Sequence, residues 1–253
     1  MDALLLLTDW QRAAGGAILG AVLGSFIGAL CSRWPDGRSV ASGRSQCDGC
    51  GAELRLRELI PILSFYAQNG RCARCKSPIG CSQLFAELAA MTIGAAAFFA
   101  LPAQDAARFA IMAWLLLPLL ILDFLYLWLP TKLVAILAIA GLVCGVLLTD
   151  NYDWRASVGA AAICWAALEG IRIFYKKFRG IEGMGAGDPK LLAALALWTG
   201  PTDLPLLLLM ASGIGLVYAL ALMTGNRNNE LKLPFGTFLA LAAMVINWPI
   251  GYI

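Results

Sequence analysis

The sequence predicts an all-α polytopic membrane protein with about eight transmembrane helices and a small cytoplasmic insert domain that resembles a zinc ribbon. Three observations predict this fold class. Hydrophobic residues make up 60% of the 253 residues, and the mean hydropathy is +0.75. Apolar stretches recur at lengths near the roughly 20 residues that a helix needs to cross a bilayer. One segment, 32–83, is instead polar and basic and contains two pairs of closely spaced cysteines.

Eight apolar stretches are candidate membrane spans. They cover 13–31, 84–101, 108–129, 132–149, 155–175, 189–201, 203–224 and 235–253. Stretch 189–201 is the weakest, because it is short and lies between Pro189 and Pro201. It can form a half helix, which membranes tolerate where protein or water surrounds it. We expect the first stretch to remain as an anchor, because Asp2 and Asp9 precede it where a signal peptide carries positive charge.

Basic residues predict the orientation of this arrangement. Of the 19 Lys and Arg residues, all except Arg12, Arg108 and Arg155 fall on one side of the eight spans. Short cytoplasmic loops are enriched in Lys and Arg, so we expect this side to be cytoplasmic and both termini to lie outside. The same arrangement brings Asp123 and Asp188 to the cytoplasmic ends of their helices.

The segment 32–83 is expected to form one cytoplasmic domain between the first helix, 1–31, and the main membrane domain, 84–253. It contains two C-x-x-C pairs separated by 21 residues: Cys47, Cys50, Cys72 and Cys75. This spacing is close to that of a tetrahedral zinc ribbon, in which four thiolates fill the metal's coordination positions. Disulfides or redox thiols are the alternative, although disulfides rarely persist in the cytoplasm. The remaining cysteines show no ligand spacing and are expected to fill apolar positions: Cys31, Cys81, Cys144 and Cys164.

Two carboxylates, Asp123 and Asp188, stand in long apolar runs, and the chain contains no histidine. An ionisable residue inside a membrane segment is costly and is therefore a functional candidate by default. The missing histidine excludes Ser-His-Asp and Cys-His catalysis and any metal centre that needs histidine ligands. Two neighbouring carboxylates can activate a water directly, because their like charges leave an acid beside a base. The sequence thus favours aspartic protease chemistry, with helix capping or polar helix packing as the alternative.

The glycine cluster at 183–187 directly precedes Asp188. In a structural interpretation it is a turn before a helix, with Asp188 as the N-cap residue and Pro189 at the first helical position. In a functional interpretation, Gly185 and Gly187 let a substrate backbone approach the carboxylate, and the loop amides hold an extended peptide. The two interpretations are compatible.

Several motifs occur in a specific order along the chain. They are GSF at 24–26, the two C-x-x-C pairs, IPILSF at 60–65, Glu87, Asp123 followed by Leu129-Pro130, GMGAGD at 183–188 with Lys190-Leu191-Leu192, and LPFG at 233–236. With these motifs the chain resembles the type IV prepilin peptidase family, the G-x-G-D membrane aspartic proteases. A lone G-x-G-D would be a weak signal, whereas this ordered set covers most of the chain.

The resemblance implies that Asp123 and Asp188 are the catalytic pair of an endopeptidase in the bacterial inner membrane. It would remove the cytoplasmic leader from type IV prepilins or type II secretion pseudopilins. Many members also methylate the new N-terminus with S-adenosylmethionine, an activity linked to the tetracysteine domain at 32–83. The expected partners are these substrates and the lipid bilayer. Orientation in the membrane accounts for the net charge of +3, and nothing indicates nucleic acid or a particular oligomeric state.

The tetracysteine domain departs from the family pattern in places. Gly28 and Leu59 stand where the family commonly has asparagine, and Ser82-Gln83-Leu84 replaces an Arg-Tyr-Pro sequence. Glu58 and Glu87 match acidic positions of the pattern. The resemblance therefore leaves retention of the methyltransferase open.

Two further positions and two other function classes complete the predictions. Thr131 stands where many members carry a second aspartate, and we expect it to open the fourth helix. Glu169 is expected to pair with Arg172, three residues later on the same helix. A zinc-domain scaffold for a secretion complex would tolerate loss of both aspartates. A transporter would use them as a proton relay and would need a through-pore.

Overall fold

The computed structural model describes residues 8–38, 45–150, 152–180, 184–223 and 233–248. The described residues form α-helices, one 3-10 helix and two isolated β-bridges, and they divide into two compact units, Met1–Ala106 and Ala107–Ile253. This all-helical architecture confirms the predicted fold class.

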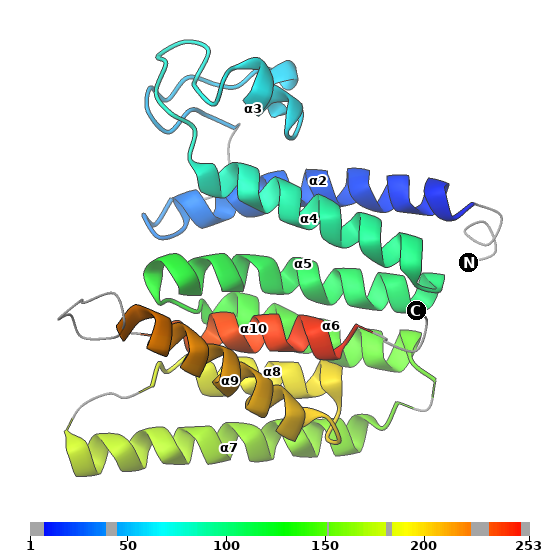
Figure 1. Cartoon of the computed structure of the whole chain (residues 1–253), viewed down its shortest axis with the longest axis vertical. Helices are drawn as coiled ribbons and strands as arrows, with labels where there is room; N and C mark the ends of the chain where they lie inside the picture. Colours follow the sequence, from blue (N-terminus) through cyan, green and yellow to red (C-terminus); the bar gives the residue numbers. More distant parts are fainter. Residues whose placement is uncertain (1–7, 39–44, 151, 181–183, 224–232, 249–253) are drawn as a thin grey trace. The chain divides into compact units, whose positions relative to one another are not determined.

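The first unit is built on the helix pair α2 (Asp9–Arg33) and α4 (Cys81–Ala100), which lie side by side (Figure 1). Glycines at 16, 20 and 24 line the contact. A Cβ atom on Gly20 would lie 2.1 Å from the carbonyl oxygen of Ala90, and one on Gly16 would lie 2.5 Å from that of Gly94. Small residues four positions apart let membrane helices approach to backbone contact. The first unit thus depends on the absence of side chains along one face of α2.

Between α2 and α4 the chain forms a small polar insert. It contains η1 (Leu56–Leu59) and α3 (Leu63–Ala67), and the two β-bridges join Gln46 to Glu53 and Arg71 to Pro78. Each bridge closes a loop that carries one C-x-x-C pair. The described part of the insert therefore consists of these two short helices, the two cysteine loops and irregular chain.

The second unit contains α5 for nearly all of its length, together with five further helices. Their bounds are α5 (Ala103–Tyr126), α6 (Thr131–Leu148), α7 (Trp154–Arg179), α8 (Asp188–Thr199), α9 (Leu204–Met223) and α10 (Phe235–Ile246). The short helix α8 contacts α6, α7 and α10 (Figure 1). Its side chains are mostly buried. It is the internal helix of this unit.

The C-terminal end of α8 is held by side chains from its neighbours. The hydroxyl of Tyr152 donates to the carbonyl oxygen of Leu197 at 2.7 Å, and the guanidinium of Arg108 donates to that of Trp198. The last carbonyl groups of any helix lack partners within the helix. Away from water these groups must be satisfied by protein, which explains the polar side chains Tyr152 and Arg108 here.

Six of the described helices are long and apolar enough to cross a membrane: α2, α4, α5, α6, α7 and α9. Both α8 and α10 have 12 residues, or about 18 Å, which is short of the roughly 30 Å apolar thickness of a bilayer. Each predicted stretch therefore contains a helix. The half-helix interpretation of 189–201 agrees with α8, while residues 249–253 of the last predicted stretch lie outside the described residues.

Candidate functional site

Asp123 and Asp188 are both buried in the second unit, each with 5% of its surface exposed. Asp123 lies one turn before the end of α5, where its carbonyl oxygen accepts the N–H of Leu127 at 2.9 Å. Asp188 is the first residue of α8. Both carboxylates thus lie at helix ends.

The Asp123 carboxylate lies at the N-terminus of α10. Its Oδ2 accepts the backbone N–H of Thr237 at 2.7 Å and the Thr237 hydroxyl at 3.1 Å. A backbone hydrogen bond from Gly236 also reaches the carboxylate. A Cβ atom on Gly236 would lie 3.0 Å from Oδ2, so a residue without a side chain is what lets the carboxylate come this close. The N–H groups at a helix N-terminus attract anions, and here they hold an aspartate. The Thr237 N–H also lies 3.1 Å from the carbonyl oxygen of Pro234, so this donor is shared.

Asp188 has a different environment. Its carboxylate lies over the preceding loop, where a Cβ atom on Gly185 would be 3.2 Å from Oδ2, and the backbone of Gly185 interacts with it. The expectation that Asp188 is the N-cap residue is wrong. Gly187 is the N-cap, and no side chain caps the helix, because the turn from Gly185 to Asp188 (N to O, 3.3 Å) brings Asp188 into the first helical position.

The two carboxylates lie close enough to interact electrostatically. Leu129 joins their surroundings. A Cβ atom on Gly187 would lie 2.6 Å from the Leu129 side chain, and one on Gly236 would lie 2.8 Å from it. The chain after α5, the glycine loop and the start of α10 therefore meet around Leu129 and the aspartates.

Thr237 is a candidate residue that the sequence analysis missed, because the LPFG motif ends one position earlier. Its hydroxyl also lies 3.3 Å from the carbonyl oxygen of Leu120, one turn before Asp123. It is a buried polar residue at the start of an otherwise apolar helix. A single polar residue next to a glycine, at the start of an apolar helix, was the sequence signal that could have identified Thr237.

Thr131 opens α6, as predicted, and its hydroxyl accepts a hydrogen bond from Lys190 at 3.4 Å. The predicted pair on α7 is also confirmed, with the Nε of Arg172 3.0 Å from a carboxylate oxygen of Glu169. Thr131 and Lys190 thus form one hydrogen-bonded pair, and Glu169 and Arg172 form another.

In the insert, the four cysteines predicted to bind metal converge. The sulfur atoms of Cys47, Cys50, Cys72 and Cys75 all lie within 4.8 Å of one another, and this group could hold a metal ion. The sulfur atoms of Cys47 and Cys75 are 3.8 Å apart. Four thiolates at about 2.3 Å from a tetrahedral Zn²⁺ have neighbouring sulfurs about 3.8 Å apart. The observed spacing fits such an ion.

The two cysteine loops repeat one backbone pattern. Cys47 N–H donates to Ala52 O and Cys72 N–H donates to Ser77 O, both at 2.9 Å. The residue after each pair has positive φ, +69° at Gly51 and +60° at Lys76. These matched turns point both thiol pairs toward one centre, which is how two loops of different sequence build a single site.

The Cys47 thiol ionises more readily than an ordinary cysteine. Burial raises its pKa, but hydrogen bonds from the Ser77 hydroxyl and from the backbone of Cys50 and Gly49 outweigh this effect and bring the pKa to about 6. Thiolate is the form that binds metal. Three of the four other cysteines are buried or half-buried, as expected, while Cys81 is exposed at the start of α4.

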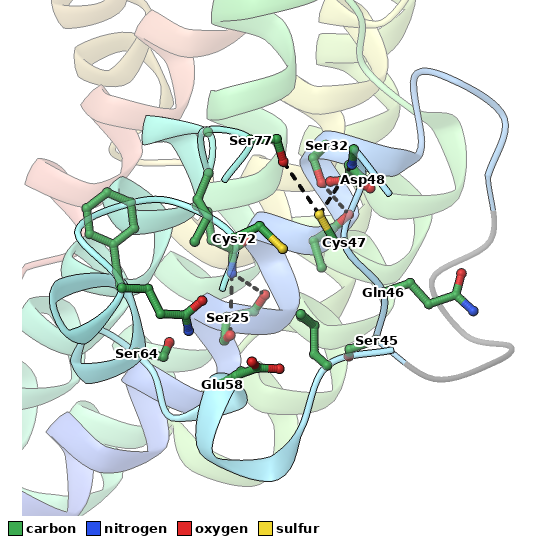
Figure 2. A pocket seen from close by; sticks show the side chains of 18 of the residues that line it. Ser25, Ser32, Ser45, Gln46, Cys47, Asp48, Glu58, Ser64, Cys72 and Ser77 are labelled. Atoms are coloured by element: carbon green, nitrogen blue, oxygen red, sulfur yellow. Dashed lines mark hydrogen bonds between the residues drawn. The ribbon is translucent and has the colours of Figure 1, made fainter. Parts of the chain in front are cut away.

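A pocket of about 190 Å³ lies beside the cysteine loops (Figure 2). Its walls include Glu58 from η1, Phe65 from α3 and Cys72, and its α4 side includes Gln83 and Glu87. The pocket is rich in hydroxyl, amide and carboxyl groups and is lined by both glutamates that matched the family pattern.

Glu87 is buried, with 5% exposure, and both carboxylate oxygens have partners. Oε1 accepts the Gln83 amide at 3.0 Å, and Oε2 accepts the backbone N–H of Ile62 at 2.7 Å. Ile62 has a φ of +64° and is the centre of a turn in which Leu63 N–H donates to Pro61 O at 2.6 Å. A β-branched residue in this conformation is strained. The Glu87 carboxylate therefore helps to hold a strained turn at the start of α3.

Two positions that depart from the family pattern lie against each other. A Cβ atom on Gly28 would be 2.5 Å from the amide oxygen of Gln83. The Gln83 amide donates to the carbonyl oxygen of Ser25 at 3.0 Å, one turn before Gly28. The absence of a side chain at Gly28 thus leaves room for Gln83, which lines this pocket.

Comparison with known proteins agrees with these motifs. Residues 18–101 match the bacterial peptidase A24 N-terminal domain, and residues 110–220 match the type IV leader peptidase family. A protein of Burkholderia pseudomallei (strain K96243), named prepilin leader peptidase/N-methyltransferase, is 36% identical over 95% of this chain and 86% of its own length. Proteins of the same name from Dichelobacter nodosus and Stutzerimonas stutzeri are 33% and 30% identical, covering 85% and 90% of this chain and 74% and 87% of their own lengths. No solved structure matches the chain.

The two matched regions contain the tetracysteine insert and the buried aspartates, respectively. Relatives of 30–36% identity span most of the chain and most of their own lengths. The helices are long and apolar enough for a multi-pass membrane protein. The chain belongs to the type IV leader peptidase family.

Proposed function

We propose that this protein is an aspartic endopeptidase that removes the leader from type IV prepilins or type II secretion pseudopilins, with Asp123 and Asp188 as its catalytic dyad. The observation that carries the proposal is the meeting of two buried, interacting carboxylates in a chain without histidine. Membership of the leader peptidase family supports the substrate class.

In this reaction one carboxylate takes a proton from water while the water oxygen attacks the scissile carbonyl carbon. The other carboxyl group donates its proton to the carbonyl oxygen. The proton on the first then passes to the leaving amine. Gly185 and Gly187 have no side chains, so the loop before Asp188 lets an extended substrate backbone come close and exposes N–H groups to it.

We further propose that the dyad works at the cytoplasmic surface of the bacterial inner membrane. The distribution of Lys and Arg supports this orientation. A leader that lies in the cytoplasm, ahead of a substrate's membrane helix, would present its cleavage site at this depth. Both aspartates lie at helix ends, which suits a scissile bond at the membrane surface.

The test is cleavage of a prepilin-type substrate in membranes by the native chain, Asp123→Asn and Asp188→Asn. We expect no mature product from either variant at equal protein levels. Asp203→Asn, which changes an exposed carboxylate, is the matched control and should cleave normally. Native cleavage by either dyad variant would contradict the proposal and favour the scaffold alternative.

A second activity, N-methylation of the mature substrate, is favoured by the pocket in the insert and by the names of the relatives. We place S-adenosylmethionine there. Its sulfonium and ammonium groups are cations, which suit the carboxylate of Glu58. The pocket is smaller than the roughly 300–1,000 Å³ of a typical small-molecule site, so the cofactor would extend beyond it. Glu87, whose oxygens are already paired, would position the α3 wall.

Mass spectrometry of the mature product tests this assignment, because methylation adds the mass of one CH₂ group to the N-terminus. We expect Glu58→Gln and Glu87→Gln to give cleaved but unmethylated product. Arg57→Gln, which changes a neighbouring exposed side chain, is the control. Full methylation by both glutamate variants would reject this pocket as the cofactor site.

We propose zinc as the metal of the tetracysteine site. Zn²⁺ with four thiolates has no open coordination position, so its role would be to stabilise the insert rather than to react. The sulfur spacing and the lowered pKa of Cys47 support this choice. Metal analysis of the purified protein, with Cys50→Ser and Cys75→Ser as comparisons, tests it.

A further inference from the structure

The two aspartates differ in the donors that surround them. Asp123 Oδ2 accepts the Thr237 N–H at 2.7 Å and its hydroxyl at 3.1 Å, and the backbone of Gly236 also reaches this carboxylate. For Asp188, the favourable contact among the described residues is with the backbone of Gly185 alone. The dyad is therefore asymmetric.

Backbone N–H groups cannot accept a proton, so they favour a carboxylate over a carboxylic acid. Those at Asp123 also belong to the first turn of α10, whose N-terminal end carries partial positive charge. The ionisable group that interacts with this carboxylate comes from α8 and is Asp188, while Lys190 on the same helix bonds to Thr131. The helix α10 carries no ionisable residue. The hydrogen-bond donors from α10 are thus the difference between the surroundings of Asp123 and those of Asp188.

Two buried carboxyl groups that repel each other share one proton. The proton is expected on the group whose charged form has fewer donors among the described residues, which is Asp188. From this geometry we propose that Asp123 is the ionised base, that Asp188 is the acid, and that Thr237 is the positioning residue that maintains this division. The inference rests on the proposed dyad and adds the role of each member.

The proton transfers then follow in order. Asp123 takes a proton from water as the water oxygen bonds to the carbonyl carbon, and Asp188 gives its proton to the carbonyl oxygen. Asp123 next gives its proton to the amine nitrogen as the C–N bond breaks. Asp188 regains a proton from the hydroxyl group that collapses to the new carboxyl group. One water is consumed, and both aspartates return to their starting states.

The Thr237 hydroxyl has one proton and two acceptors within reach, Asp123 Oδ2 at 3.1 Å and Leu120 O at 3.3 Å. The backbone N–H remains in any variant, whereas the hydroxyl can be removed. Thr237→Val keeps the shape of the side chain and removes this donor. Thr237→Ser keeps the donor and loses only the methyl group, so the two variants separate hydrogen bonding from packing.

The test is the pH dependence of kcat/KM for cleavage of a prepilin-type substrate. The native enzyme, Thr237→Val and Thr237→Ser are compared in the same detergent. The acidic limb reports ionisation of the base. Loss of a donor to ionised Asp123 should move that limb to higher pH by about one unit, so that activity there falls about tenfold. Thr237→Ser should keep the native acidic limb.

An unchanged acidic limb in Thr237→Val, whatever its absolute rate, would overturn the inference, as would a displacement of the alkaline limb alone. If Thr237→Val does not accumulate, Thr237→Ala replaces it, and its pH profile is compared with that of Thr237→Ser. Failure of the dyad itself is distinguishable, because Asp123→Asn and Asp188→Asn would then still cleave.

Discussion

Glu87 and Asp188 are equally buried carboxyl groups, yet their surroundings differ in kind. Both oxygens of Glu87 accept hydrogen bonds, from Ile62 N–H and from Gln83. Asp188 instead interacts with a second carboxylate, Asp123, and with the backbone of one glycine. Burial by itself therefore does not mark a reactive group. A fully paired carboxylate is suited to holding structure, whereas an under-paired one beside a like charge is suited to exchanging protons.

The largest expected effect tests this comparison directly. Asp188→Asn should lower the cleavage rate by at least about a thousandfold, because the residue acts in the bond-breaking steps. Glu87→Gln, equally buried, should cleave at close to the native rate. Rates are measured on one substrate at matched protein concentration. A comparable loss of cleavage in Glu87→Gln would show that the two carboxylates are not separated in function.

The second prediction concerns the metal site beside Glu87. Metal binding needs thiolates, and Cys47, with a pKa of about 6, is ionised at neutral pH. Bound zinc competes with protons for this thiolate, so zinc should be retained at pH 6 and released only at lower pH. The measurement is zinc release against pH with a coloured chelator. Cys47→Ser should bind zinc weakly throughout, and Cys81→Ser, which changes a cysteine outside the cluster, should behave as native.

The third prediction has the smallest expected effect and concerns the packing around Glu87. This residue lies on α4, against which α2 packs. In Gly20→Ala the new methyl group would meet Ala90 O, and moving the helices apart should cost about 1–3 kcal/mol. Gly15→Ala, on the same helix but with nothing within 4 Å, should be neutral or slightly stabilising. Thermal unfolding in one detergent compares them. Equal melting temperatures would mean that the close helix contact contributes little.

Much of the fold followed from the sequence. Helices formed in all eight apolar stretches, because a membrane chain must satisfy its backbone groups internally. The last predicted stretch ran past the end of α10 at Ile246, although Asn247 and Pro249 were available as signals for the end of a helix. The spacing of Cys47, Cys50, Cys72 and Cys75 predicted their convergence, because each C-x-x-C loop is a local structure. The predicted start of α8 was wrong by one residue, because that start depends on the single turn from Gly185 to Asp188.

The sequence by itself determined which groups could react: two isolated aspartates, four paired cysteines and no histidine. These follow from residue type and from the cost of placing charge in an apolar run. Only the tertiary structure showed that Thr237, 114 residues from Asp123, donates to its carboxylate, and that Gln83 occupies the space beside Gly28. Hydrogen bonds between distant segments depend on how helices pack, and packing geometry leaves no periodic signal in the chain.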